Sequence, residues 1–490
     1  MNNAAVRRAK QYGQFFTPRT VARALVRWAL ADANGRILDP ACGDGQFLAC
    51  HDRAVGVELD TEHAATAARR APRAFVHAGV DFFEWAARSN ERFEAAVGNP
   101  PFIRYQGFAG STRQRALAMA QRIGADLPAL TSSWAPFVAA AAALVKPAGR
   151  IAFVVPAEIG HAAYAKPLLI ALCRSFSYVQ IVALRRQLFP ELAEDAWLLY
   201  CRGRGGDTSQ IHLSILDSFE ESPLPPAVAQ RIPIEAITSK HGHLRRWLLP
   251  DDIRIAYETV QTGPGVVRLG DVAYVGIGYV TGANDFFHLR PSDVRRLAIP
   301  KRFLRPAVRK GESLPRDKAL TVSHVRTWIA ADKPLFLLYL TAQARKEHAI
   351  RRYLATPAAD KARTAYKCRV RKPWYVVPAV SVPDGFLTYM SGERVSLIQN
   401  KAGCVATNSV HVVSMNAGCP FDLIQRGWDT PLARLSCEIE GHPLGGGMLK
   451  IEPREAQRIV VPREGALADP AMAAIFERGV AAMRRWRHLS

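Results

Sequence analysis

The sequence predicts an α/β fold, with a doubly wound sheet in the first half of the chain and a second domain of mixed α+β structure. In the first hundred residues, short apolar runs of strand length recur, and each leads to a polar residue. Residues 218–250 are rich in proline and mixed charge, as a linker would be. Residues 251–490 hold short apolar runs and Gly-rich turns, and 490 residues suffice for two or three domains. We therefore expect domains at 1–217 and 251–490.

The first strand is expected at Ile37-Leu38, followed by a loop suited to a ligand. Asp39 ends the strand, and Gly43 and Gly45 allow the backbone to turn tightly beneath a bound molecule. A helix is expected to follow. Two glycines are a weak signal alone, and they do not make the dinucleotide fingerprint with its three spaced glycines.

The second and third strands also end in carboxylates. The run Ala54–Glu58 predicts a strand tipped by Glu58, where an acidic residue typically accepts from ribose hydroxyls. A carboxylate at a helix N-terminus is an equally common interpretation. The run Ala74–His77 leads to Asp81, which is suited to accept from an adenine amino group, with Phe82 beside the ring.

The fourth strand, Phe93–Val97, leads to Asn99–Phe102, which reads N-P-P-F. The two prolines fix φ and remove competing N–H groups. The amide oxygen of Asn99 and the carbonyl of Pro100 are left as adjacent acceptors for both hydrogens of an exocyclic amino group. The ring of Phe102 is placed to stack on the base that carries it. Considered alone, a proline-rich surface turn explains these residues equally well.

In this order, the motifs make residues 11–202 resemble the catalytic domain of S-adenosylmethionine-dependent N6-adenine DNA methyltransferases of the gamma arrangement. Five segments carry the resemblance: Gln14–Pro18, Asp39–Gly45, Glu58, Asp81-Phe82 and Asn99–Phe102. The resemblance implies a Rossmann-like fold, S-adenosylmethionine as cofactor, and a flipped adenine in double-stranded DNA as substrate.

The resemblance also implies roles for individual residues. The expected cofactor-binding residues are Thr17, Asp39, Ala41, Gly43, Gly45, Glu58, Leu59, Asp81 and Phe82. The expected catalytic residues are Asn99, Pro100, Pro101 and Phe102, together with one aromatic residue further along the chain. Phe102 departs from the commoner Tyr, so a hydrogen bond from a hydroxyl is lost there while stacking is kept.

That further aromatic residue is expected on the last strands of the sheet. Ser133–Val145 predicts a helix, Ile151–Val155 a buried strand, and Asp195–Arg202 a final strand. In the family, a ring in this region stacks on the far face of the flipped base. Tyr200 is the first choice and Trp197 the second. The alternative is that Tyr200 fills the core.

The composition indicates a polyanionic partner. The formal net charge is +22, and the basic excess runs through both halves of the chain. Clusters lie at 295–310 and 361–372, the second beside Trp374 and Tyr375. A solvated basic surface is the simpler alternative.

The eight cysteines lack C-x-x-C spacing, and we interpret them as reduced thiols of a cytoplasmic protein without a zinc site. The longest apolar runs are too short to span a membrane.

Residues 251–490 resemble, more weakly, the target-recognition domain of restriction–modification methyltransferases. The phrases VTGAND, ATNSVH and GGGMLKIEP carry this resemblance. Asn284, Asn408 and His411 are candidates for contacts to bases or phosphates, with simple loop capping as the alternative for each. Asp469–His488 predicts a terminal helix.

The basic segment Ile103–Leu130 is expected to close over the extruded base or touch the target strand. If so, replacing Arg113 and Arg115 together weakens DNA binding and lowers its salt dependence.

The main prediction is thus a site-specific adenine DNA methyltransferase that needs no metal, with a separately encoded restriction endonuclease as a further partner. RNA or a protein glutamine as the substrate of the same N-P-P-F chemistry is the alternative. A binding protein with a vestigial site is disfavoured by the intact Asn99, Glu58 and Asp81. Cytosine is disfavoured because amino-cytosine enzymes usually have Ser in place of Asn99.

Overall fold

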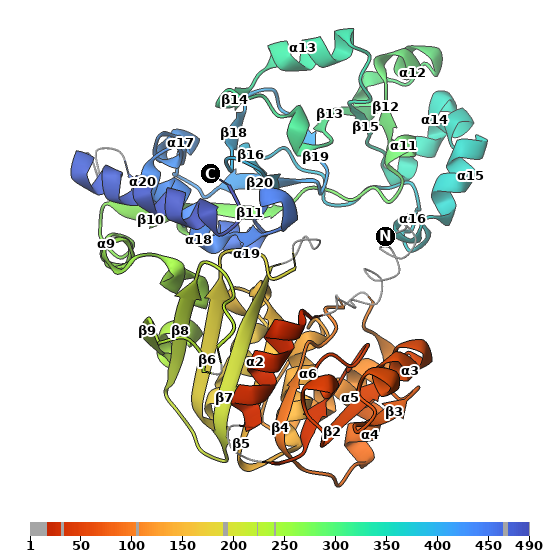
Figure 1. Ribbon diagram of the computed structural model, residues 1–490. Coiled ribbons are helices and arrows are strands. Elements are labelled where there is room, and N and C mark those ends of the chain that lie inside the picture. The colour runs from red at the N-terminus through yellow and green to blue at the C-terminus, as the bar shows by residue number, and fades with distance from the viewer. Residues whose placement is uncertain are drawn as a thin grey trace. The chain divides into compact units, whose positions relative to one another are not determined.

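The computed structural model describes residues 17–30, 34–103, 107–189, 195–222, 224–239, 242–463 and 469–489. The chain forms two compact units, Met1–Leu248 and Leu249–Ser490, and each has its own sheets (Figure 1). In the described residues, we find no helix long and apolar enough to cross a membrane. We likewise find no group of three or more His, Cys, Asp or Glu side chains arranged to hold a metal ion in those residues.

The first unit is built on a nine-stranded sheet with the order β3-β2-β1-β4-β5-β7-β6-β8-β9. The strands are β1 (Ile37–Asp39), β2 (Ala54–Glu58), β3 (Phe75–Ala78), β4 (Phe93–Gly98), β5 (Val145–Pro156), β6 (Phe176–Leu184), β7 (Ala196–Arg204), β8 (Gln210–Leu216) and β9 (Gln230–Pro233). Strands β1 to β5 run parallel, whereas β7 runs antiparallel to both β5 and β6. The central strands are buried on both faces, which explains their continuous apolar sequence.

Helices pack on this sheet and bury its faces (Figure 1). They are α2 (Arg19–Leu30), α3 (Thr61–Arg70), α4 (Phe82–Arg88), α5 (Gly110–Gln121), α6 (Trp134–Ala143), α7 (Ala165–Cys173) and α8 (Ile234–Thr238). Helix α2 contacts β4 and β5, and α3 contacts β2 and β3. Parallel strands alternating with helices make the doubly wound fold that the sequence predicts.

The segment 218–250, expected as a linker, lies largely within the first unit. Strand β9 pairs antiparallel with β8 at the edge of the sheet, where proline is tolerated because one side of the strand makes no ladder hydrogen bonds. The Pro226 carbonyl accepts a hydrogen bond from Gln180 Nε2 at 2.9 Å, which attaches the proline-rich stretch to β6. The low apolar content of this segment is therefore that of an edge strand, β9, and of the residues that lead into it.

The second unit contains four smaller sheets, of which the largest has the order β11-β20-β16-β18-β14. The strands of all four sheets together are β10 (Val266–Arg268), β11 (Ala273–Ile277), β12 (His288–Leu289), β13 (Leu304–Val308), β14 (Ala319–Leu320), β15 (Phe336–Leu338), β16 (Gly385–Thr388), β17 (Met390–Ser391), β18 (Leu397–Asn400), β19 (Val405–Ala406), β20 (Val410–Met415), β21 (His442–Pro443), β22 (Leu449–Lys450) and β23 (Val460–Pro462).

The helices of this unit lie between and beside those sheets (Figure 1). They are α9 (Asp251–Val260), α10 (Leu269–Val272), α11 (Asn284–Phe287), α12 (Pro291–Arg296), α13 (Val322–Ala330), α14 (His348–Tyr353), α15 (Pro357–Thr364), α16 (Tyr366–Arg369), α17 (Phe421–Trp428), α18 (Pro431–Glu440), α19 (Pro453–Ala456) and α20 (Pro470–Arg485). The unit therefore has the mixed α+β structure that the sequence predicts.

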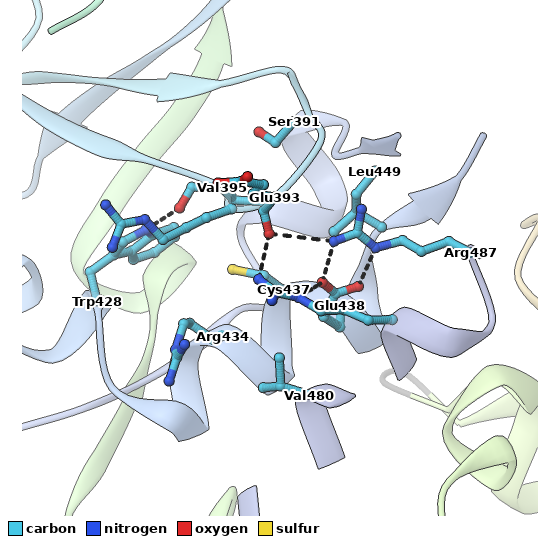
Figure 2. Close-up of a pocket in the computed structure, with 12 residues that line it drawn as sticks. Ser391, Glu393, Val395, Trp428, Arg434, Cys437, Glu438, Leu449, Val480 and Arg487 are labelled. Carbon is cyan, nitrogen blue, oxygen red and sulfur yellow. Dashed lines mark hydrogen bonds and ion pairs between the residues drawn. The ribbon is translucent and has the colours of Figure 1, made fainter. Parts of the chain in front are cut away.

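The terminal helix α20 is fastened by a buried ion pair, shown in Figure 2. The Arg487 guanidinium donates to both carboxylate oxygens of Glu438 on α18, at 2.9 and 2.6 Å, and Arg487 is only 2% exposed. It also donates to the carbonyls of Gly392 and Gly447. A bidentate pair with further backbone acceptors satisfies a buried charge, so this arginine joins three segments of the unit.

Candidate active site

The carboxyl ends of β1, β2 and β4 open onto a cavity of about 170 Å³ in the first unit. Its lining includes eight of the residues expected from the sequence: Ala41, Gly43, Glu58, Leu59, Asp81, Phe82, Asn99 and Pro101. This is the edge of a doubly wound sheet at which ligands bind, because the strand ends and helix N-termini converge there.

The loop after β1 forms one wall of the cavity. Asp39 Oδ1 accepts a hydrogen bond from Ala41 N at 3.2 Å, and burial raises the pKa of Asp39 to about 8. Gly45 has φ of +85°, and a Cβ atom there would lie 2.8 Å from the Cα of Ala67 on α3. The loop therefore needs glycine both for its left-handed backbone and for close packing of the helix.

Glu58 is held rigidly at the end of β2. Its Oε2 accepts from Gly43 N at 2.8 Å and its Oε1 from Asp60 N at 2.8 Å. The side chain is only 6% exposed. Each carboxylate oxygen keeps a further lone pair, so the arrangement suits the recognition of hydroxyl donors.

Asp81 and Phe82 form the next wall, at the start of α4. Asp81 Oδ1 caps the helix by accepting from Glu84 N at 2.9 Å, and Oδ2 accepts from Thr112 Oγ1 at 3.4 Å. The ring of Phe82 stacks on that of Phe137 on α6, with centroids 5.3 Å apart and planes 14° apart. The wall therefore combines a carboxylate oxygen with an aromatic surface suited to a planar heterocycle.

The N-P-P-F turn begins where β4 ends. Gly98 has φ of +153°, and a Cβ atom there would lie 2.7 Å from Asp39 Oδ1, so glycine lets β4 end close beside β1. Asn99 and Pro101 line the cavity, whereas Pro100 and Phe102 are not among its lining residues.

Ser133, at the start of α6, holds this turn in place. Its hydroxyl donates to the Pro101 carbonyl and accepts from Ile103 N at 2.9 Å. Its backbone N–H donates to the Ile103 carbonyl at 2.9 Å. The Ser133 hydroxyl makes no bond to its own helix, and the residue is fully buried. These three bonds fix the backbone on both sides of Phe102.

Tyr200, the aromatic residue expected to stack on the far face of the base, does not line this cavity. It is 4% exposed on β7, and its ring meets that of Trp28 on α2 edge to face, with centroids 4.8 Å apart. Because β7 is buried on both faces, the alternation of its side chains does not reveal which of them face a ligand site. The second choice, Trp197, is also buried, with its ring against Gly160.

Three further expected cofactor residues do not line the cavity. Asp39 and Gly45 shape its loop, and Thr17 is buried just before α2. Of the motif that includes Thr17, Gln14 to Phe16 lie outside the described residues.

Sequence reasoning missed several lining residues, among them His63, Phe108, Thr112, Ser133 and Phe137. They lie on helices and loops whose sequences carry no local sign of a ligand site. Ser133 meets a turn 30 residues earlier in the chain, and nothing in the local sequence signals such a contact.

The glycine loop, the acidic strand ends and the strand order with antiparallel β7 define a Rossmann-like methyltransferase domain. Comparisons with known proteins agree. The profile of the N-6 DNA Methylase family matches residues 1–68, and that of the C-terminal domain of type II methyltransferase M.Eco57I matches residues 242–485. The chain is therefore similar to N6-adenine DNA methyltransferases at the start of its first unit and to type II methyltransferases along both units.

Relatives match nearly the whole chain at low identity. Type II methyltransferase M.AccI of Acinetobacter calcoaceticus is 19% identical over 92% of this chain and 85% of its own length. M.XamI of Xanthomonas campestris pv. amaranthicola is 23% identical over 93% of this chain and 86% of its own length. The type IIL restriction–modification enzyme MmeI, solved in complex with DNA, shares the fold with a TM-score of 0.52 at 12% identity, covering 99% of this chain and 72% of that one.

Proposed function

We propose that the cavity binds S-adenosylmethionine beside a flipped adenine of double-stranded DNA, and that the methyl group is transferred to the adenine N6. The observation that carries this proposal is the convergence of Gly43, Glu58, Asp81 and Asn99 on one cavity from four separate segments. Each brings a polar group that suits one part of an adenosyl ligand or of the target base.

The residues present fit this cofactor. The Glu58 carboxylate, oriented by two backbone N–H groups, would accept from the ribose hydroxyls. Asp81 would accept from the adenine amino group of the cofactor, with Phe82 and Phe137 against its ring. When bound, the cofactor supplies an electrophilic methyl group. The resemblance adds Thr17 at its carboxylate.

The chain's own contribution to the transfer is orientation. Asn99 Oδ1 and the Pro100 carbonyl would accept the two N–H bonds of the target amino group, and Phe102 would stack on its ring. Acceptors placed where positive charge develops on nitrogen stabilise the transition state. An amino group inside a duplex is out of reach, so the base must first leave the stack. Stacking of this kind is worth about 1–3 kcal/mol per base.

The family supports DNA as the substrate. The relatives are type II methyltransferases, and MmeI is a restriction–modification enzyme whose structure was solved in complex with DNA. We therefore infer that this chain acts in the cytoplasm with a separately encoded restriction endonuclease, and that its second unit recognises the target sequence. An RNA or a protein glutamine is the alternative substrate.

Two variants separate cofactor binding from catalysis. Glu58→Ala should weaken S-adenosylmethionine binding in calorimetry by at least about tenfold, since one buried charge-assisted contact is worth about 1.5–3 kcal/mol. Asn99→Ala should bind the cofactor normally and lose transfer of labelled methyl groups to DNA. The exposed Glu62→Ala is the matched control for Glu58. Normal cofactor affinity in Glu58→Ala, or active Asn99→Ala, would contradict these roles.

A further inference from the structure

Helices α15 and α16 of the second unit carry an unusual group of cations. What we call the α15–α16 basic surface consists of Lys361, Arg363, Lys367 and Arg369 on these helices, together with Lys372 three residues after the end of α16. All five are exposed, and between Lys361 and Pro383 the sequence has no Asp or Glu. The two helices contact each other at one side of the unit (Figure 1).

The charges of this surface are not balanced by acidic partners. Within the described residues, no ion pair joins any of the five to a carboxylate. Other exposed cations of the same unit do have such partners. Examples with an Asp within 4.0 Å are Arg296, Lys318, Arg394 and Arg478. The exposed cations of this stretch therefore keep their positive charge without a carboxylate within 4.0 Å among the described residues, in contrast to these four.

The surface is held in a defined position by the VTGAND segment. Arg371, from the same stretch, points inward and donates to the carbonyls of Thr281, at 2.7 Å, and Val280, at 2.5 Å. Gly282 has φ of +85°, and a Cβ atom there would lie 2.7 Å from Lys367 Cβ. With Cys368 fully buried beside them, these contacts leave the neighbouring Lys367 and Arg369 facing solvent.

Aromatic side chains are interleaved with the cations. Tyr366 is 63% exposed, with Lys367 Nζ 5.7 Å from its ring centroid. Arg363 lies over Trp374 at 6.0 Å. Unpaired like charges on two short helices repel one another, and a bound polyanion offsets that repulsion. Basic residues with interspersed aromatic rings are the usual composition of a nucleic-acid surface.

We propose that the α15–α16 basic surface binds the phosphate backbone of the duplex and sets its register for the base-reading residues. The proposal rests on the proposed function, because it takes DNA as the ligand. These side chains would therefore contribute to the affinity for DNA and not to the choice of sequence, since phosphate contacts carry no sequence information directly.

His411, one of the residues considered for DNA contact, is fully buried and donates to the Ile451 carbonyl at 2.6 Å, so its role is to stabilise the fold.

The test is the salt dependence of binding to a fluorescent DNA duplex. The variant replaces Lys361, Arg363, Lys367 and Arg369 with Ala. The charge-matched control replaces Arg296, Lys318, Arg394 and Arg478 with Ala. Each lost phosphate contact should lower the slope of log K against log salt by about 0.9, so the variant should lose up to about 3.6 and the control almost none. Cofactor affinity and kcat at saturating DNA should be unchanged.

Three outcomes would overturn the proposal. The slope of the variant equals that of the wild type, or the control loses as much slope as the variant. Tighter binding of duplex RNA than of DNA by the wild type, with the same loss of slope, would reassign the surface to RNA. A wild-type protein that binds DNA with the expected slope but methylates no DNA would instead contradict the proposed function and leave this surface standing.

Discussion

Replacing Ser133 with Ala tests whether the N-P-P-F turn must be held rigidly for methyl transfer. The change removes the hydroxyl that joins the Pro101 carbonyl and the Ile103 N–H, and leaves the backbone bond to Ile103 in place. Losing a partner for a buried polar group costs about 1–3 kcal/mol. Because both partners are only half-buried, we expect a loss near about 1–2 kcal/mol in unfolding free energy.

The effect on turnover should exceed what this loss of stability explains. A misplacement of about 1 Å at a reacting group costs on the order of 100-fold in rate. We therefore expect single-turnover transfer at saturating cofactor and DNA to fall about 10- to 100-fold, while cofactor affinity changes less than about twofold, because Glu58 and Asp81 keep their contacts.

A matched control comes from the same unit. Ser214 is 1% exposed, accepts from Gln180 Nε2 at 2.8 Å and donates to the Ala227 carbonyl at 2.9 Å. Ser214→Ala should lose similar stability and keep its single-turnover rate. If Ser133→Ala transfers methyl groups as fast as the wild type, or if both variants slow equally, the reasoning is refuted.

Three other predictions follow from the packing. Gly45→Ala should weaken cofactor binding and lower the melting temperature, because a Cβ atom there meets the backbone of α3; unchanged calorimetric affinity would count against it. Arg487→Met should cost about 3 kcal/mol in urea unfolding by leaving Glu438 buried without its bidentate partner, whereas the exposed Arg485→Met should not. Burial lowers the pKa of His288 from 6.5 to about 4, so the stability tied to this shift is full above pH 6.5 and is lost as pH falls through about 4. Between those pH values, the wild type should lose roughly 2.5 kcal/mol more than His288→Gln, and parallel pH profiles would contradict this assignment.

The sequence predicted the strand ends of the first unit well, because their signals are local. Apolar runs that end in Asp39, Glu58 and Asn99 require only a buried strand and a turn after it, and the structure has β1, β2 and β4 there. The glycine loop after β1 could be predicted equally well, since Gly45 is required by its own backbone conformation.

The contacts between distant segments were not readable. Tyr200 lies on a strand buried on both faces, where alternation carries no information about which side faces a ligand. Phe137 and Ser133 act on turns far from them in the chain, and their helix α6 is apolar nearly all round. The proline-rich approach to β9 predicted a linker because composition does not distinguish an edge strand from a loop.

The identity of the modified nucleoside tests the central claim most directly. Double-stranded DNA of mixed sequence would be incubated with the protein and labelled S-adenosylmethionine and then digested to nucleosides, with Asn99→Ala alongside. The nucleosides would be separated by chromatography and identified by mass spectrometry. We predict label in N6-methyl-2′-deoxyadenosine, within one short sequence motif, and none with the variant. Label in N4-methylcytosine, label in RNA or protein only, or equal label with Asn99→Ala would contradict it.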